Sequence, residues 1–213
     1  MLVVKHISSG YGKKQVLFDV SLTVNKGDVV LLTGGNGSGK STLLKCIYNL
    51  LTCWEGEIIF EGQKLNGLKP SNLIQKRIVY IPQKDFYFEN LTVEENLKIS
   101  GNVLSKEMIR DRISEVYYLT GLGNYKKRKP FNLSGGERKI LAFGMGLMHK
   151  PHLLLFDEPF AGVDAKNATT LLRLFQETII TPENGVIIVE HKDDAKRLFT
   201  RKIKMELGKI KNI

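Results

Sequence analysis

The stretch Gly34-Gly35-Asn36-Gly37-Ser38-Gly39-Lys40-Ser41-Thr42 constrains the fold more than any other part of the chain. It fits the pattern G-x-x-x-x-G-K-[ST] without a mismatch, between an apolar run at residues 28–33 that reads as a strand and a predicted helix at 41–51. The glycines let the backbone curl so that successive N–H groups face an anion, and the helix N-terminus adds unpaired donors. Lys40 can reach the β- and γ-phosphates, and the Ser41 hydroxyl can bind Mg²⁺. This context predicts a nucleotide-binding loop rather than an ordinary turn.

The composition is that of a soluble globular protein with room for a sizeable core, because 42% of the 213 residues are hydrophobic and 25% are charged. The two cysteines, Cys46 and Cys53, have no metal-type spacing, which favours free thiols in a reducing compartment. The N-terminus is charged too early for a signal peptide. The longest apolar run, 140–148, is well under the ~18 residues of a membrane span, so we expect no such span.

Polar residues follow several apolar runs that read as strands. Gln83 follows the run 77–81, Asp157 and Glu158 end the run that starts at 152, and His191 ends the run that starts at 185. Ligands of open α/β sheets bind at the carboxyl ends of the strands. Successive strand residues point to opposite faces, so Asp157 and Glu158 are expected to do different jobs. One can hold Mg²⁺ through water, and the other can orient or deprotonate an attacking water.

Residues from about 84 to 133 read as a helical insertion. Thr92 and Glu95 form a capping-box pattern, and residues 105–118 carry apolar side chains at helical spacing. After the insertion, Ser134-Gly135-Gly136-Glu137 opens another helix with small residues and free N–H groups, which predicts a second anion site. Near the N-terminus, residues 2–7 and 16–24 read as antiparallel strands, with Ser9 to Lys14 as the connecting turn. Tyr11, between the two glycines of this turn, either stacks on an adenine or packs on the surface, and the turn alone does not decide between the two.

Taken together, these motifs resemble the nucleotide-binding subunit of an ATP-binding cassette (ABC) transporter, over essentially the whole chain and in the family's order. The resemblance implies an α/β fold: a phosphate-loop NTPase core with a mainly parallel central sheet, a small N-terminal antiparallel β-subdomain and a helical subdomain. It predicts one ABC ATPase domain over 1–213, with the core and antiparallel part in 1–83 and 134–213 and the helical subdomain at about 84–133.

The resemblance also implies a head-to-tail dimer with two ATP molecules, each lying between the phosphate loop of one chain and the signature Ser134 to Glu137 of the other. In this reading Glu158 is the general base, and Lys40 and the rest of Gly34 to Thr42 bind the phosphates. Ser41 and Asp157 hold Mg²⁺, and Gln83 contacts the metal and the water. His191 binds the γ-phosphate, Asp164 couples the two sites, and Tyr11 stacks on adenine. The partners are a second nucleotide-binding subunit and transmembrane permease subunits, at the cytoplasmic face of the membrane.

Some residues depart from the usual family pattern. Glu137 replaces a glutamine, which resembles the lipopolysaccharide-export and branched-chain amino-acid uptake branches, and residues 160–164 resemble the former more. Ile140 and Met145 stand where arginines are usual. Because the sequence ends soon after His191, we expect no C-terminal regulatory domain of the kind that some importers carry. The alternative is a soluble ABC-type ATPase acting on ribosomes or nucleic acid, which suits the net charge of +10. Such relatives usually carry two cassettes, and the one dense basic run, 126–129, lacks interleaved aromatics. A module without turnover is disfavoured by Glu158 and His191.

Overall fold

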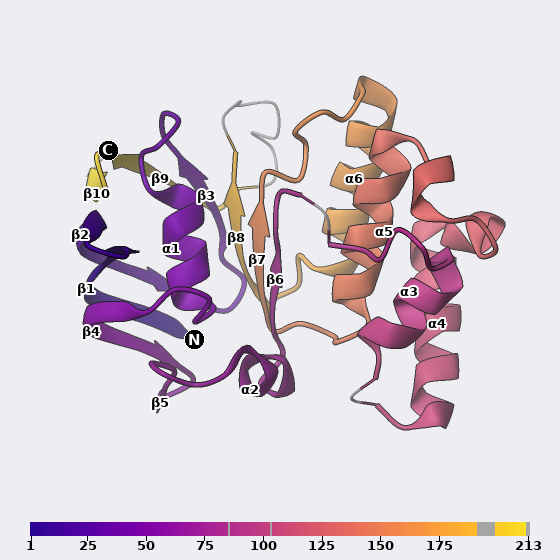
Figure 1. Ribbon diagram of the computed structural model, residues 1–213, viewed down its shortest axis with the longest axis horizontal. Helices are drawn as coiled ribbons and strands as arrows, with labels where there is room; N and C mark the ends of the chain where they lie inside the picture. The colour runs from indigo at the N-terminus through magenta and orange to yellow at the C-terminus, as the bar shows by residue number, and fades with distance from the viewer. Residues whose placement is uncertain (85, 103, 191–198, 212–213) are drawn as a thin grey trace.

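The computed structural model describes residues 1–84, 86–102, 104–190 and 199–211. Figure 1 shows an antiparallel sheet with helix α1 at one end of the molecule, a mainly parallel sheet in the middle and a group of helices at the other end. This is the layout of an α/β phosphate-loop core with an antiparallel N-terminal part, so the expected fold class is confirmed.

The central sheet has six strands within the described residues, and four of its five strand pairs are parallel. In spatial order the strands are β10 (Lys209–Lys211), β9 (Arg201–Glu206), β3 (Val29–Thr33), β8 (Gly185–Val189), β7 (Leu153–Asp157) and β6 (Ile78–Ile81). The last four are buried along nearly their whole length, as expected for strands covered on both faces. The exception to the parallel pairing is the antiparallel hairpin formed by β9 and β10.

The second sheet is antiparallel and has the order β2 (Lys14–Val24), β1 (Leu2–Tyr11), β4 (Cys53–Phe60) and β5 (Gln63–Lys64). The sequence suggested that Ser9 to Lys14 connects the first two strands, but β1 continues to Tyr11. Gly10 explains the difference, because a Cβ there would lie 2.0 Å from the Lys14 carbonyl oxygen and 2.8 Å from the Trp54 ring. Only glycine lets the neighbouring backbone approach this closely. Tyr11 is therefore the last residue of a strand.

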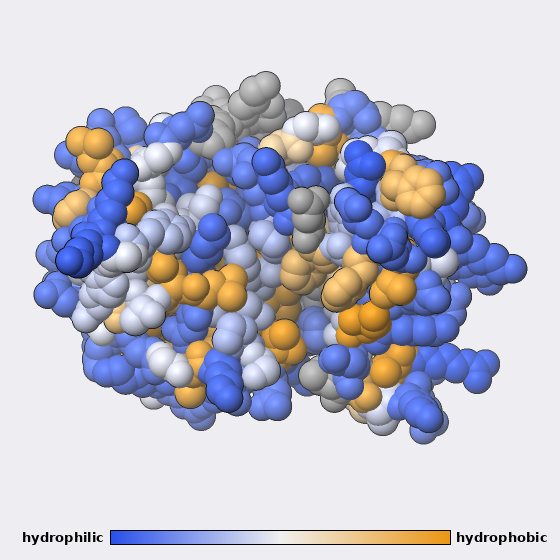
Figure 2. Space-filling view, in the orientation of Figure 1, coloured by the Kyte–Doolittle hydropathy of each residue, from blue (hydrophilic) through white to orange (hydrophobic). Residues whose placement is uncertain are grey.

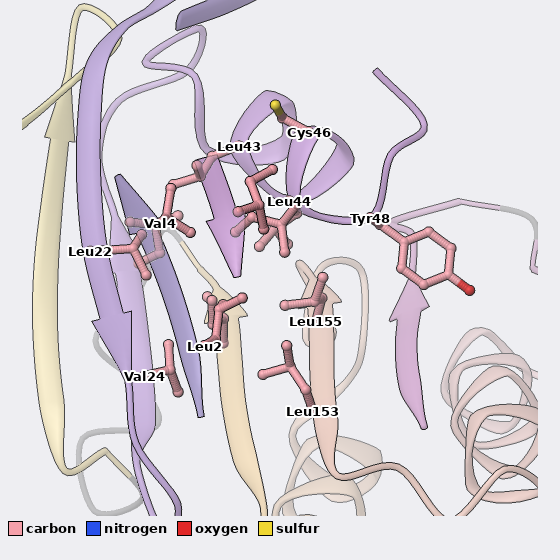
Figure 3. Packing of buried hydrophobic residues seen from close by; sticks show 14 of the residues in the cluster. Leu2, Val4, Leu22, Val24, Leu43, Leu44, Cys46, Tyr48, Leu153 and Leu155 are labelled. Atoms are coloured by element: carbon pink, nitrogen blue, oxygen red, sulfur yellow. The ribbon is translucent and has the colours of Figure 1, made fainter. Parts of the chain in front are cut away.

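Helix α1 (Lys40–Ile47) lies between the two sheets and forms the centre of one hydrophobic core. Figure 3 shows Leu43 and Leu44 of α1 facing Leu2 and Val4 of β1 on one side and Leu155 of β7 on the other. These five side chains are at most 1% exposed. The helix that follows the phosphate loop is thus fixed by packing on both sheets, which fixes the loop as well.

Helix α1 ends four residues earlier than the sequence suggested. Asn49 has φ 55°, a left-handed conformation that asparagine adopts more readily than most residues. Its side-chain amide donates to the Leu65 carbonyl at 2.5 Å and to the Leu68 carbonyl at 3.1 Å. A tertiary contact therefore ends the helix, and no local breaker is needed.

Helix α2 (Pro70–Gln75) packs through Leu73 into the same core as α1. The remaining helices cover the other face of the central sheet and extend beyond it, as Figure 1 shows for α3 to α6. They are α3 (Val93–Ser100), α4 (Lys106–Thr120), the 3-10 helices η1 (Leu122–Tyr125) and η2 (Pro130–Asn132), α5 (Gly135–Leu147) and α6 (Ala165–Thr178). The rings of Phe143, Phe156 and Phe175 pack at centroid distances of 4.7, 5.3 and 6.3 Å and join α5 and α6 to β7. The capping box of Thr92 and Glu95 is confirmed.

Candidate functional site

The phosphate loop joins β3 to α1 at the carboxyl end of the central sheet. Gly34 and Gly39 have φ values of 150° and 103°, which favour glycine, and a Cβ at Gly34 would lie 2.2 Å from the Met205 carbonyl oxygen. Lys40 is buried, and its ammonium group donates to the carbonyls of Gly34 at 2.9 Å and Gly35 at 3.0 Å. The lysine thus folds across the loop and holds its cation where the loop curls.

Two features of the loop suit an anionic ligand. Burial lowers the pKa of Lys40, an effect opposed by the carboxylates of Glu158 and Asp157, so a bound anion would favour its charged form. Among the described residues, the buried hydroxyl of Ser38 has no hydrogen-bond partner. A buried polar group without a partner is costly, and a ligand at the loop can satisfy it.

Asp157 lies at the end of β7 and is 3% exposed. Its carboxylate accepts hydrogen bonds from the Ser41 hydroxyl at 2.9 Å and from the Tyr80 hydroxyl at 3.4 Å. Burial raises its pKa, and the hydrogen bonds only partly oppose that. Asp157 therefore lies beside the phosphate loop, because Ser41 is in the first turn of α1, the helix that follows the loop.

Glu158 turns away from that pair, although it is the next residue. Its backbone has φ 49°, unusual for a residue with a side chain, and its N–H donates to the Val189 carbonyl at 3.0 Å. Its carboxylate accepts a short hydrogen bond from the side-chain amide of Gln83. The strained backbone separates the two carboxylates: Asp157 meets Ser41, and Glu158 meets Gln83.

These residues surround one cavity of about 840 Å³, a volume typical of small-molecule sites. Its lining consists of Tyr11, Lys14, Val16, the loop residues Asn36 to Thr42, Gln83 and Glu158. Tyr11 is 48% exposed, and the Lys45 ammonium lies 6.0 Å from the centre of its ring. Tyr11 thus lines the cavity with about half of its surface exposed. The predicted site residue His191 lies outside the described residues.

The signature residues do not line this cavity in their own chain. Ser134 is the N-cap of α5, and it forms a capping box with Glu137: its N–H donates to the Glu137 carboxylate at 2.7 Å, and its hydroxyl accepts from the Glu137 N–H at 3.2 Å. The Ser134 hydrogen bond is the main cause of the lowered pKa of Glu137. The carboxylate of Glu137 therefore satisfies its own helix end in this state.

Asp164 lies beside the signature. It is the N-cap of α6, and its carboxylate accepts from the backbone N–H of Asn167 at 2.9 Å and from the side-chain amide at 2.7 Å. A Cβ at Gly136 would lie 2.3 Å from the Asn167 side chain. The start of α5 and the start of α6 thus pack so closely that Gly136 has no room for a side chain.

The motif search missed several groups at the site. The Tyr80 hydroxyl on Asp157 comes from a buried strand with no distinctive pattern. Glu190, 6% exposed, accepts from the Phe160 N–H at 2.8 Å; an ionisable residue directly after an apolar strand is a signal that could have drawn attention to it. Lys139 contacts both Gln83 and Glu158, and no sequence pattern indicates this.

A glycine loop between a parallel strand and a buried helix, with a serine and an aspartate at its edge, defines a phosphate-loop NTPase. The family model described as ABC transporter matches residues 17–161, more than half of the chain, so the chain belongs to the ABC transporter family. It is an ATP-binding and ATP-hydrolysing subunit of that family, which confirms the expectation from the motifs. No helix in the described part of the chain has the length and hydrophobicity needed to cross a membrane.

Relatives and solved structures agree with this assignment. A probable branched-chain amino acid transport ATP-binding protein LivF of Archaeoglobus fulgidus is 41% identical, over 79% of this chain and 72% of the relative. BraG of Pseudomonas aeruginosa, a high-affinity branched-chain amino acid transport ATP-binding protein, is 35% identical over 99% and 91% of the two chains. These transport names favour the transporter reading over the ribosome or nucleic-acid alternative.

Two solved structures have the same fold. A nucleotide-free ATP-binding cassette from an ABC transporter has a TM-score of 0.90 at 30% identity, and the match covers 100% of this chain and 90% of that one. A dimeric post-hydrolysis cassette bound to ADP and Pi has a TM-score of 0.87 at 27% identity, covering 100% and 97%.

Proposed function

We propose that this chain hydrolyses Mg²⁺-ATP at the interface of a head-to-tail dimer, where the phosphate loop of one subunit and the signature of the other close on each nucleotide. One observation carries the proposal. Within the described residues, the phosphate loop, Gln83 and Glu158 line the cavity, whereas Ser134 and Gly135 of the signature do not line it and are exposed on the surface. The signature N–H groups can reach a triphosphate only from a second chain. The dimeric relative bound to ADP and Pi supports this arrangement.

The residues present suit Mg²⁺. The Ser41 hydroxyl and the Asp157 carboxylate supply hard oxygen ligands side by side, and the buried carboxylate, whose pKa is raised by burial, gains from a neighbouring cation. Gln83 is the third residue that we assign to the metal. The ion would neutralise part of the phosphate charge.

The chain's own residues supply the rest of the chemistry. Lys40 exchanges the carbonyls of Gly34 and Gly35 for the β- and γ-phosphates. The Gln83 amide first gives up its hydrogen bond to the Glu158 carboxylate. The Glu158 carboxylate then takes a proton from the attacking water. Tyr11 stacks on the adenine, while His191 binds the γ-phosphate and Asp164 couples the two sites.

A second nucleotide-binding subunit and transmembrane permease subunits complete the proposed transporter, with this chain bound peripherally at the cytoplasmic face of the membrane. The helical subdomain at about 84–133, within the single 1–213 domain, is the proposed docking region. Its large apolar side chains Phe88, Met108 and Phe131 are 53%, 56% and 66% exposed. Figure 2 shows apolar residues interrupting the hydrophilic surface on the helical side of the molecule. Exposed apolar groups on this scale support a protein partner.

For the transported molecule we propose branched-chain amino acids, taken up into the cell. The supporting observations are the names of the relatives LivF and BraG. ATPase activity of the subunit, assembled with the permeases that co-purify with it and their binding protein, is expected to rise with leucine and not with sulfate. Stimulation by an unrelated solute alone overturns the substrate assignment and leaves the ATPase assignment intact.

The variant Glu158→Gln tests the catalytic proposal. It removes the base but keeps the side-chain shape, so ATP hydrolysis is expected to fall by about 10²–10⁴-fold, the usual contribution of a general base. ATP binding remains, and a dimer accumulates with ATP in gel filtration. Glu183→Gln, an exposed carboxylate paired with Lys26, is the matched control and keeps wild-type turnover. Wild-type turnover by Glu158→Gln contradicts the assignment, and a trapped monomer contradicts the dimer.

A further inference from the structure

Lys139, in the second turn of α5, lies where three segments of the chain meet. Its ammonium group donates to the backbone carbonyl of Gln83 at 2.6 Å and to that of Glu158 at 3.4 Å. The side chain is half-buried and lines a small cleft of about 190 Å³ between Gln83 and Gly162. One cation thus connects the signature helix, the segment after β6 and the segment after β7.

Two contacts of Lys139 are to backbone carbonyl oxygens, and these suit a role in positioning the chain. A cation on two carbonyl oxygens fixes where the backbone lies and neither gives nor takes a proton in the reaction. Glu158 needs such support because its φ of 49° is unfavourable for a residue with a side chain. The side-chain amide of Gln83 donates a hydrogen bond to the Glu158 carboxylate. Lys139 connects the backbones of the same two residues by donating to both of their carbonyl oxygens.

Helix α5 gives this contact a direction. Ser134 caps the helix, and Lys139 lies five residues later, about 7.5 Å along a helix at 1.5 Å per residue. The capping box and the tight packing of Gly136 on Asn167 make this first stretch of the helix rigid. A displacement of the signature therefore moves Lys139 and the two carbonyls that it holds.

We infer that Lys139 is a positioning residue, which holds Glu158 and Gln83 in catalytic register and ties their position to the signature helix of the same chain. The inference rests on the proposed role of Glu158 as general base. It adds a link within one subunit between the signature, which serves the partner's ATP, and the carboxylate that serves its own. Displacing the base by a fraction of an ångström is enough to slow the reaction.

The test compares Lys139→Met, Lys139→Gln and Lys139→Arg with Lys5→Met, which changes an exposed lysine of β1 away from the cavity. Steady-state ATPase assays are expected to give a kcat about tenfold lower for Lys139→Met, with KM for ATP changed by less than about threefold. Lys139→Arg and Lys139→Gln, which keep a donor, recover part of kcat, and Lys5→Met matches the wild type. Thermal unfolding of each variant shows whether it is folded.

A second measurement separates positioning from binding. In the Glu158→Gln background, Lys139→Met is expected to leave the ATP-bound dimer seen by gel filtration unchanged, because the residue acts through the base and not on nucleotide affinity. Wild-type kcat in Lys139→Met, or loss of the trapped dimer in the double variant, overturns the inference. A wild-type chain without ATPase activity instead overturns the proposed function, so the two failures are distinguishable.

Discussion

Gly136 in the signature offers a test of packing that can be worked from the structure. A Cβ added there would lie 2.3 Å from Cβ and Cγ of Asn167, and Asn167 is held by two hydrogen bonds to Asp164. The neighbouring Gly135 differs, because its Cβ would meet only the Gly162 carbonyl oxygen at 3.5 Å, an ordinary contact. Both positions are in the first turn of α5, so Gly→Ala brings a similar gain in helix propensity at each.

The difference between the two alanine variants therefore isolates the clash. Overpacking typically costs about 1–3 kcal/mol, so Gly136→Ala is expected to be less stable than Gly135→Ala by that amount. For a chain of this size each kcal/mol lowers Tm by about 2–4 °C. Thermal unfolding followed by circular dichroism, without nucleotide, measures both variants. Equal Tm values refute the claim that Gly136 is required by packing on Asn167, whatever its role toward a phosphate.

Three further predictions concern other parts of the molecule. Asp157→Asn is expected to make the nucleotide-free protein more heat-stable at neutral pH, because burial raises the pKa of Asp157 and disfavours its ionised form. The difference in Tm between the variant and the wild type should shrink as pH falls through that raised pKa towards 3.8. A variant that is less stable than the wild type at neutral pH contradicts this prediction. Tyr11→Ala is expected to weaken ATP binding in calorimetry by about 1 kcal/mol, with tripolyphosphate binding unaffected. Phe143→Ala removes one ring of the α5–β7–α6 cluster and is expected to cost about 3–5 kcal/mol in denaturant unfolding; a cost under 1 kcal/mol argues against the cluster as a core.

Motifs tied to chemistry at fixed spacing could be predicted from the sequence. The phosphate loop needs glycines, a lysine and a hydroxyl in one order. The apolar strand that ends at Asp157 places that carboxylate at the carboxyl end of the sheet. The capping box of Thr92 and Glu95 is equally local, since both residues lie within one turn. In each case the physical constraint acts within a few residues, so the sequence carries it.

Contacts between distant segments could not be predicted in the same way. Lys139 reaches residues 56 and 19 positions away, and the early end of α1 depends on the Asn49 amide bonding carbonyls 16 and 19 residues on. The continuation of β1 to Tyr11 depends on Lys14 and Trp54 coming close to Gly10. Periodicity and propensity do not encode such pairings, because each of these residues also suits a solvent-exposed loop or helix face.

The arrangement within one chain has a consequence for the proposed dimer. Gly136 packs on Asn167, Asn167 is hydrogen-bonded to Asp164, and Lys139 of the same helix holds the backbone of Glu158. In the dimer that we propose, the part of the subunit that faces the partner's ATP is thereby joined to the part that serves its own. Because packed interiors transmit strain, we expect closure on one nucleotide to reposition the proposed base at the other. In the dimer that we propose, coupling between the two sites is therefore a result of packing inside each subunit as well as of contacts between them.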